Sequence, residues 1–250
     1  MVVGILHPGE MGAAVGAALR GNRHDVLWAS QGRGADSVRR AEEAGLRDVE
    51  SVGVLLAEAD VVFSIVPPHA ASGVAADAVG FGGLFVDANA VSPATVRGLA
   101  PARLVDGGLI GPPPLESGTT RLYLSGEAAE DIAGLFTGSP LEARALAGGI
   151  GVASALKMVY AAWSKGTAAL VLAIRDVARA TGVEEPLLAE WSESVPELLP
   201  RLMQAERSAA TKGWRWIGEM EEIADTFAAA GQPEGFHRAA AQVYREWADR

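Results

Sequence analysis

Apolar positions in the first 145 residues follow two alternating periods. Short runs rich in β-branched and other apolar residues predict buried strands, and the stretches between them carry apolar residues at helical spacing. The runs that we interpret as strands are VVGIL at the N-terminus and residues 24–30, 60–66, 82–90, 103–111 and 121–126. The intervening segments include predicted helices from about Gly12 to Leu19 and from Asp36 to Ala44. Such alternation predicts right-handed crossovers and a mainly parallel sheet.

The pattern changes around residues 143–150. Residues 152–181 have helical periodicity almost without a break, ending at Gly182, and the rest of the chain up to Arg250 has further helical periodicity with Pro and Gly stops. We therefore predict an α/β domain over residues 1–145 and an all-α domain over 146–250. A helix over 152–181 would be about 45 Å long, more than a small helical domain buries alone. Its apolar second half, ALVLAI, favours a homodimer formed through the helical domains.

Composition narrows the class of protein. The chain has 49% apolar and 21% charged residues, which is typical of a globular protein. It has no cysteine, which excludes disulfides and a thiol nucleophile, and its net charge of −10 disfavours a nucleic-acid partner. We expect neither a signal peptide, because the first residues lack a basic segment, nor a membrane span, because the apolar run at 166–174 has nine residues. We predict a cytoplasmic enzyme or binding protein.

The stretch GILHPGEMGAAVG, residues 4–16, reads as a strand, a glycine-marked turn and a helix. His7 stands where a G-x-G-x-x-G phosphate loop carries its first glycine. A residue before proline favours extended backbone, so His7 can continue the strand. Gly9 then allows close approach to a pyrophosphate, Gly12 allows tight packing of the helix, and the helix N-terminus attracts an anion. The loop predicts a dinucleotide site; a plain strand–helix corner is the alternative.

The end of the second predicted strand bears on which dinucleotide binds. A ribose-binding carboxylate is expected about 20 residues after the glycine loop. Ser30 occupies that place, and Arg33 follows. A missing carboxylate and an added guanidinium suit a 2′-phosphate, so we predict NADP, with NAD possible. His7 is expected to face the cofactor near a phosphate, or else to be a structural histidine. The four histidines show no metal-ligand spacing, and we predict no metal.

Several motifs together resemble the β-hydroxyacid dehydrogenases and 6-phosphogluconate dehydrogenase over nearly the whole chain. They are HPGEMG at 7–12, SIVPP at 64–68, VDANAVSP at 86–93, VDGGLIGPP at 105–113 and GVASALKMVYAAWSKG at 151–166. RWIGEMEEIADTF at 215–227 is similar to a little-characterised branch with a phosphogluconate-dehydrogenase-like C-terminal domain. The resemblance implies a doubly wound Rossmann domain, then an all-α domain, with the active site between them. It also implies NAD(P)-dependent oxidation of a hydroxyl or reduction of a carbonyl.

The resemblance further implies roles for individual residues. Lys157 matches the catalytic lysine, whose ammonium can protonate the oxygen formed as hydride reaches a carbonyl carbon. Gly9, Glu10 and Met11 would line the pyrophosphate, and Asn89 would lie near the nicotinamide ribose. The full set of expected cofactor-binding residues is His7, Pro8, Gly9, Glu10, Met11, Ser30, Arg33, Val66, Pro67 and Asn89.

The expected substrate positions depart from the family pattern. Ala161 replaces an asparagine, Ile110-Gly111-Pro112 replaces Ser-Gly-Gly, and Gly218-Glu219 falls where the family has Lys-Asp. We therefore expect a substrate unlike 3-hydroxyisobutyrate or 6-phosphogluconate. The expected substrate residues are Ile110, Gly111, Ser154, Tyr160 and Trp214. The aromatic residues Tyr160, Trp163, Trp214 and Trp216 would shape an apolar pocket, or else belong to the core or a dimer interface.

Three functions remain open. The first is an NADP-dependent reductase or dehydrogenase acting on a small carbonyl or hydroxyl compound, with Lys157 as proton shuttle. The second is imine reduction on the same scaffold, which the retained lysine disfavours. The third is a non-catalytic NADP-binding regulator, which would bind NADPH without turnover. A methyltransferase is disfavoured because Ser30 is not acidic.

Overall fold

The computed structural model describes residues 1–248 and divides the chain into two compact units. The first unit spans Met1–Lys157, and the second begins at Met158. The division falls inside helix α7 (Val152–Ala180), so residues 152–157 group with the first unit.

The first unit is built on one eight-stranded sheet with the order β3-β2-β1-β4-β5-β6-β7-β8. The strands are β1 (Val2–Ile5), β2 (Asp25–Trp28), β3 (Arg47–Asp48), β4 (Val61–Ser64), β5 (Leu84–Asp87), β6 (Leu104–Ile110), β7 (Thr120–Ser125) and β8 (Leu141–Ala145). Neighbouring strands are parallel except at the β6–β7 pair, which is antiparallel. The predicted mainly parallel, doubly wound sheet is therefore confirmed. The sequence did not predict the short strand β3 or strand β8.

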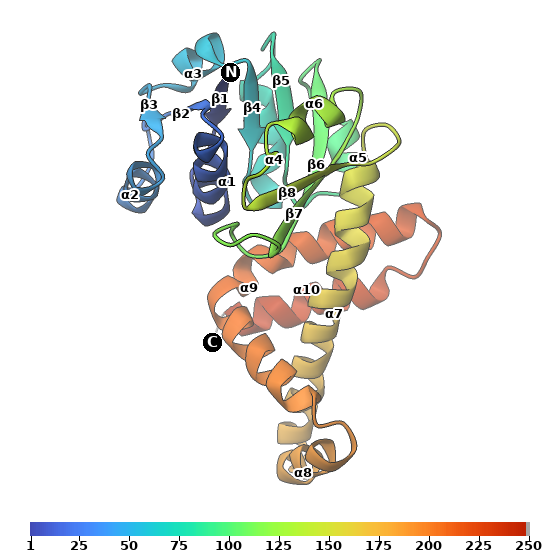
Figure 1. Cartoon of the computed structure of the whole chain (residues 1–250). Helices are drawn as coiled ribbons and strands as arrows, with labels where there is room; N and C mark the ends of the chain where they lie inside the picture. Colours follow the sequence, from blue (N-terminus) through green and yellow to red (C-terminus); the bar gives the residue numbers. More distant parts are fainter. Residues whose placement is uncertain (249–250) are drawn as a thin grey trace. The chain divides into compact units, whose positions relative to one another are not determined.

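Helices cover both faces of this sheet, as Figure 1 shows for α1 beside β1 and α4 near β4. They are α1 (Glu10–Gly21), α2 (Ala35–Glu43), α3 (Val52–Glu58), α4 (Pro68–Asp77), α5 (Pro93–Arg97) and α6 (Ala129–Gly134). Successive strand residues point to opposite faces, which splits the core into two layers. Val3 and Phe63 lie in the layer with α1 and α6, and Leu27 and Val62 in the layer with α3 and α4.

The second unit contains most of α7 and the helices α8 (Glu184–Ser194), α9 (Leu198–Ala229) and α10 (Gly235–Ala248). Helix α7 ends just before Gly182, whose positive φ is the left-handed conformation that favours glycine.

 The φ angle of Gly182 is 73°, and Gly231, which follows α9, has a φ of 69°. The predicted helix over 152–181 is thus confirmed with its stop. Helices α9 and α10 run side by side (Figure 1), and the rings of Trp216 and Tyr244 meet edge to face at 5.1 Å.

No helix within residues 1–248 is both long enough and apolar enough to cross a membrane. Helix α7 has the length, but Lys157, Lys165 and Arg175 interrupt its apolar positions.

Candidate functional site

The turn between β1 and α1 opens the first unit's candidate site. Gly9 is the N-cap of α1, and within the described residues no side chain caps the first turn. A Cβ on Gly9 would meet nothing within 4 Å, so the loop is open at this point. A Cβ on Gly12 would lie 2.3 Å from the carbonyl oxygen of His7, so only glycine lets the helix pack this closely. The turn therefore presents unsatisfied backbone N–H groups beside open space, which suits an anion.

Two nitrogen atoms near this turn are buried without a hydrogen-bond partner among the described residues. They are Nδ1 of His7 and Nε of Arg33. Burial, and then the charge of Arg33, lower the pKa of His7 to about 4. Buried polar groups in folded proteins are nearly always paired, so unpaired ones on two neighbouring loops point to a ligand that supplies acceptors.

Beside the end of β2 lies Asp48 of β3, a residue that the sequence did not single out. The backbone N–H of Ser30 donates to Oδ1 of Asp48 at 3.1 Å, and the N–H of Glu50 donates to the same oxygen at 2.8 Å. A carboxylate thus lies beside Ser30 although position 30 itself is not acidic. Strand β3 is two charged residues long, so no hydrophobic pattern could have placed Asp48 there.

Asn89 links the ends of two central strands. Its Oδ1 accepts from the N–H of Val66 at 2.6 Å, and its Nδ2 donates to Asp87 at 2.6 Å and to Ser64 at 3.0 Å. Asn89 is 2% exposed. Its side chain therefore fixes the backbone of Val66, and Pro67, which follows, is the N-cap of α4. These residues shape the carboxyl ends of β4 and β5, where we predict that a cofactor binds. Their contact with a cofactor stays a prediction.

Lys157 lies at the carboxyl end of β6. Its Nζ donates to the carbonyl oxygen of Leu109 at 2.5 Å, and its side chain is half-buried. One helical turn earlier, the hydroxyl of Ser154 donates to Oδ1 of Asp106 at 2.6 Å. Ser154 has no exposed surface, so its hydroxyl serves this bond, and its contact with a substrate stays a prediction. Sequence reasoning missed Asp106, because 48 residues separate it from Ser154.

The two other substrate candidates in the first unit lie at the end of β6. Ile110 is 7% exposed, and Gly111 has a φ of 127°. A Cβ on Gly111 would lie 2.4 Å from the carbonyl oxygen of Thr119. Gly111 is therefore required by the packing of the chain at this turn, whatever its role toward a substrate.

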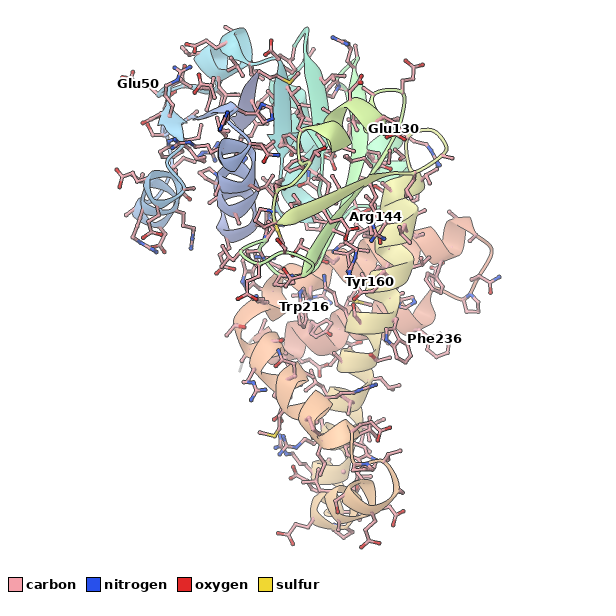
Figure 2. The ribbon with its side chains drawn as sticks, in the orientation of Figure 1. Glu50, Glu130, Arg144, Tyr160, Trp216 and Phe236 are labelled. Atoms are coloured by element: carbon pink, nitrogen blue, oxygen red, sulfur yellow. The ribbon has the colours of Figure 1, made fainter. Side chains whose placement is uncertain are left out.

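The second unit holds the remaining candidates, and Figure 2 shows Tyr160 on α7 and Trp216 on α9. Tyr160 is 50% exposed and Trp214 is 55% exposed. Buried Glu219 forms an ion pair with partly buried Lys165, whose ammonium lies 5.5 Å from the centre of the Trp216 ring. Glu219, which falls where the resemblance placed an aspartate, therefore neutralises a lysine of α7.

No group of three or more His, Cys, Asp or Glu side chains that could hold a metal ion occurs within residues 1–248.

Comparison with known proteins finds relatives across the whole chain. Residues 178–247 match a family described as a domain of unknown function (DUF1932). An uncharacterized 28.5 kDa protein of Methanothermus fervidus is 27% identical over 203 residues, which are 78% of this chain and 77% of that protein.

Solved structures give the clearest likeness. MTH1747, a conserved protein of unknown function with structural similarity to 3-hydroxyacid dehydrogenases, is 26% identical, with a TM-score of 0.73 over 100% of this chain and 97% of that one. A 3-hydroxyisobutyrate dehydrogenase of Mycobacterium tuberculosis is 17% identical, with a TM-score of 0.69 over 99% and 94% of the chains. A reductive aminase of Aspergillus terreus, solved with NADPH and ethyl levulinate, is 17% identical, with a TM-score of 0.59 over 98% and 92%. The structural neighbours are thus 3-hydroxyacid dehydrogenases and related reductases, and the resemblance seen in the sequence is confirmed.

Proposed function

We propose that this protein is an NADP-dependent oxidoreductase that transfers hydride between the nicotinamide and a small carbonyl or hydroxyl compound. The observation that carries the proposal is the open β1–α1 turn, residues 6–11, which we call the nucleotide corner. There, the uncapped first turn of α1 lies beside the unpaired nitrogen atoms of His7 and Arg33. The sheet order changes direction between β1 and β4, and ligands of open α/β sheets bind outside such a switch point.

The proposed cofactor contacts follow from this corner. The N–H groups of Glu10 and Met11 would hold the pyrophosphate, and Arg33 would hold a 2′-phosphate. A related fold solved with NADPH supports a nicotinamide cofactor, and Arg33 favours the phosphorylated form. Asp48 beside Ser30 is the feature that would favour NAD, because a carboxylate can accept from a ribose hydroxyl.

The cofactor, when bound, would donate or accept the hydride. Lys157 would move the accompanying proton: its ammonium protonates the carbonyl oxygen during reduction, and the neutral amine takes the proton back during oxidation. The bond to the Leu109 carbonyl holds Nζ at the carboxyl end of β6. For substrate binding we propose Ile110, Gly111, Tyr160 and Trp214, with Ser154 acting through Lys157.

The test of this proposal removes the proton donor and leaves the nucleotide corner intact. We expect Lys157→Met to lower kcat by about 10²- to 10⁴-fold, because general acid–base catalysis contributes that much, with unchanged NADPH affinity. Lys212→Met is the matched control, because Lys212 is exposed on α9. Turnover would be followed as NADPH oxidation with a panel of 2-oxo, 3-oxo and aldehyde compounds. Equal kcat for the wild type and Lys157→Met would remove the catalytic role of Lys157.

A second candidate is imine reduction, which the likeness to a reductive aminase favours. The same assay with cyclic imines, and with ketones plus amines, separates the two reactions. A protein that binds NADPH but turns over neither panel would instead be a regulator.

We also propose a homodimer formed through the helical unit. Exposed apolar side chains repeat along one side of α7 in the second unit: Val159 (53%), Trp163 (65%), Leu170 (60%), Ile174 (39%) and Val177 (63%). Spacings of three, four and seven residues place them on one helix face, as in helices that pack against another helix. The partner that we propose is a second copy of the chain. The cytoplasmic location stays a prediction.

A further inference from the structure

The start of α7 is tied to the sheet by a buried carboxylate. Oδ2 of Asp106, in β6, accepts from the backbone N–H of Gly151 at 2.8 Å, from the N–H of Ser154 at 3.0 Å and from the hydroxyl of Ser125 at 3.0 Å. Its other oxygen accepts from the Ser154 hydroxyl at 2.6 Å. Asp106 has no exposed surface. One side chain of the sheet therefore satisfies N–H groups at a helix start far along the chain.

These bonds cap the N-terminus of α7. The carbonyl of Gly151 accepts from Ala155, so Gly151 precedes the first helical residue. The Ser125 hydroxyl accepts from the N–H of Ala153 at 3.1 Å, which satisfies one more group of the first turn. A carboxylate at a helix N-terminus is also favoured by the helix dipole. Asp106 thus fixes both where α7 begins and how it is rotated on β6.

The same strand then contacts the helix one turn later. A Cβ on Gly108 would lie 2.9 Å from the carbonyl oxygen of Ala153 and 3.1 Å from the Cβ of Lys157. The absent side chain of Gly108 therefore lets α7 lie directly on β6. The next residue of the strand, Leu109, supplies the carbonyl that accepts from Lys157 Nζ. Strand β6 controls the start of the helix, the position of the Lys157 Cβ and the direction of its ammonium.

We infer that Asp106 is a positioning residue for Lys157, and that it acts through Ser154 and the first turn of α7. The inference rests on the proposed function, because it assumes that the placement of Lys157 matters for proton transfer. It assigns to the buried Ser154 hydroxyl the task of orienting the helix instead of binding a substrate.

The chain allows a direct test without a known substrate, because its only lysines are Lys157, Lys165 and Lys212. Reductive methylation with formaldehyde and an amine–borane, followed by peptide mass spectrometry, gives a rate for each lysine. In the wild type we expect Lys157 to react more slowly than the exposed Lys212. Asp106→Ala and Ser154→Ala should raise the Lys157 to Lys212 rate ratio by about fivefold or more, the factor for one lost hydrogen bond.

Asp106→Asn is the conservative variant. Its amide oxygen can take the position that receives three donors, while its NH₂ group donates to the Ser154 hydroxyl. We expect it to keep the wild-type rate ratio. Ser51→Ala removes the cap of α3 and is the control for general destabilisation; it should also leave the ratio unchanged.

The inference is overturned if a folded Asp106→Ala or Ser154→Ala protein keeps the wild-type ratio. It is also overturned if folded Asp106→Asn reacts like Asp106→Ala, since charge and not geometry would then hold Lys157. Should Asp106→Ala fail to fold, Ser154→Ala carries the test alone. Absence of turnover with every substrate panel would end the proposed function but leave these rates interpretable. Where turnover is found, Asp106→Ala should lower kcat without changing NADPH affinity.

Discussion

The two units leave different kinds of groups without partners. In the first unit, polar atoms at one corner are unpaired: Nδ1 of His7 and Nε of Arg33. In the second unit, the largely buried charges Lys165 and Glu219 neutralise each other, and exposed apolar side chains are left along α7. Nδ1 of His237 also has no hydrogen-bond partner among residues 158–248, but the His237 ring packs against the Phe227 ring, at 4.3 Å between centroids. The difference is the basis for proposing a polar ligand at the first unit and a second copy of the chain at the second.

The largest effect should come from breaking the largely buried ion pair of the second unit. Glu219→Ala leaves the Lys165 ammonium without its carboxylate, and we expect a loss of about 3–5 kcal/mol in the free energy of unfolding. Urea denaturation followed by tryptophan fluorescence reports on this unit, because Trp28 is the first unit's one tryptophan. The double variant Lys165→Met/Glu219→Leu should recover most of the loss. NADPH affinity should not change, and a large fall in affinity would contradict the division of roles.

A somewhat smaller effect is expected at the apolar face of α7. Trp163→Glu places a charge among the exposed apolar residues and should weaken the proposed dimer by about 2–4 kcal/mol, as is typical of a central aromatic interface residue. Ser164→Glu is the matched control, because Ser164 is next to Trp163 in the sequence and is also exposed, but it is not one of the apolar residues of this face. Sedimentation velocity at micromolar concentration would measure both variants. A wild-type protein that sediments as a monomer would remove the dimer proposal.

The next effect concerns the 2′-phosphate. Arg33→Met should weaken NADPH binding by about thirtyfold, which corresponds to about 2 kcal/mol for a charged hydrogen-bonded contact, and should leave NADH binding unchanged. Arg39→Met is the control, since Arg39 is exposed and already paired with Asp36 and Glu43. Calorimetric titration gives the affinities. An equal loss of affinity for NADPH and NADH would show that Arg33 does not bind the 2′-phosphate.

The last effect is a pH dependence at His7. Its pKa is about 4 in the folded protein, below the ordinary value of 6.5, because burial and then Arg33 disfavour the charged form. The unfolded chain therefore binds the proton first as pH falls. The stabilisation is complete above about pH 6.5 and is lost as the pH approaches 4. His7→Gln should flatten this part of the curve of unfolding free energy against pH, and an unaltered slope would count against a buried neutral imidazole.

Local patterns predicted the parallel sheet and the glycine turn well. The run VVGIL and the spacing of Gly9 and Gly12 encode a strand, a turn and a closely packed helix within a few residues. Strand β3 was missed because its two charged residues carry no hydrophobic period, and β8 because its exposed positions carry Glu142 and Arg144. Both depend on neighbouring strands rather than on their own residues.

The candidate site was likewise predictable only where its residues lie in a local sequence pattern. Lys157 stands out on its helix, but the carboxylate that anchors that helix comes from β6, and nothing in the spacing of Asp106 and Ser154 predicts their bond. The pairing of Lys165 with Glu219 joins two helices in the same way. Contacts between distant segments depend on tertiary packing, which the periodicity of a single chain does not encode.

The central claim is that the β1–α1 turn holds a nicotinamide dinucleotide. Titration of the purified protein with NADPH and with NADH in a calorimeter tests it most directly. We expect one NADPH site per chain, with tighter binding of NADPH than of NADH, and we expect Lys157→Met to bind NADPH as the wild type does. A folded protein that takes up neither nucleotide would contradict it.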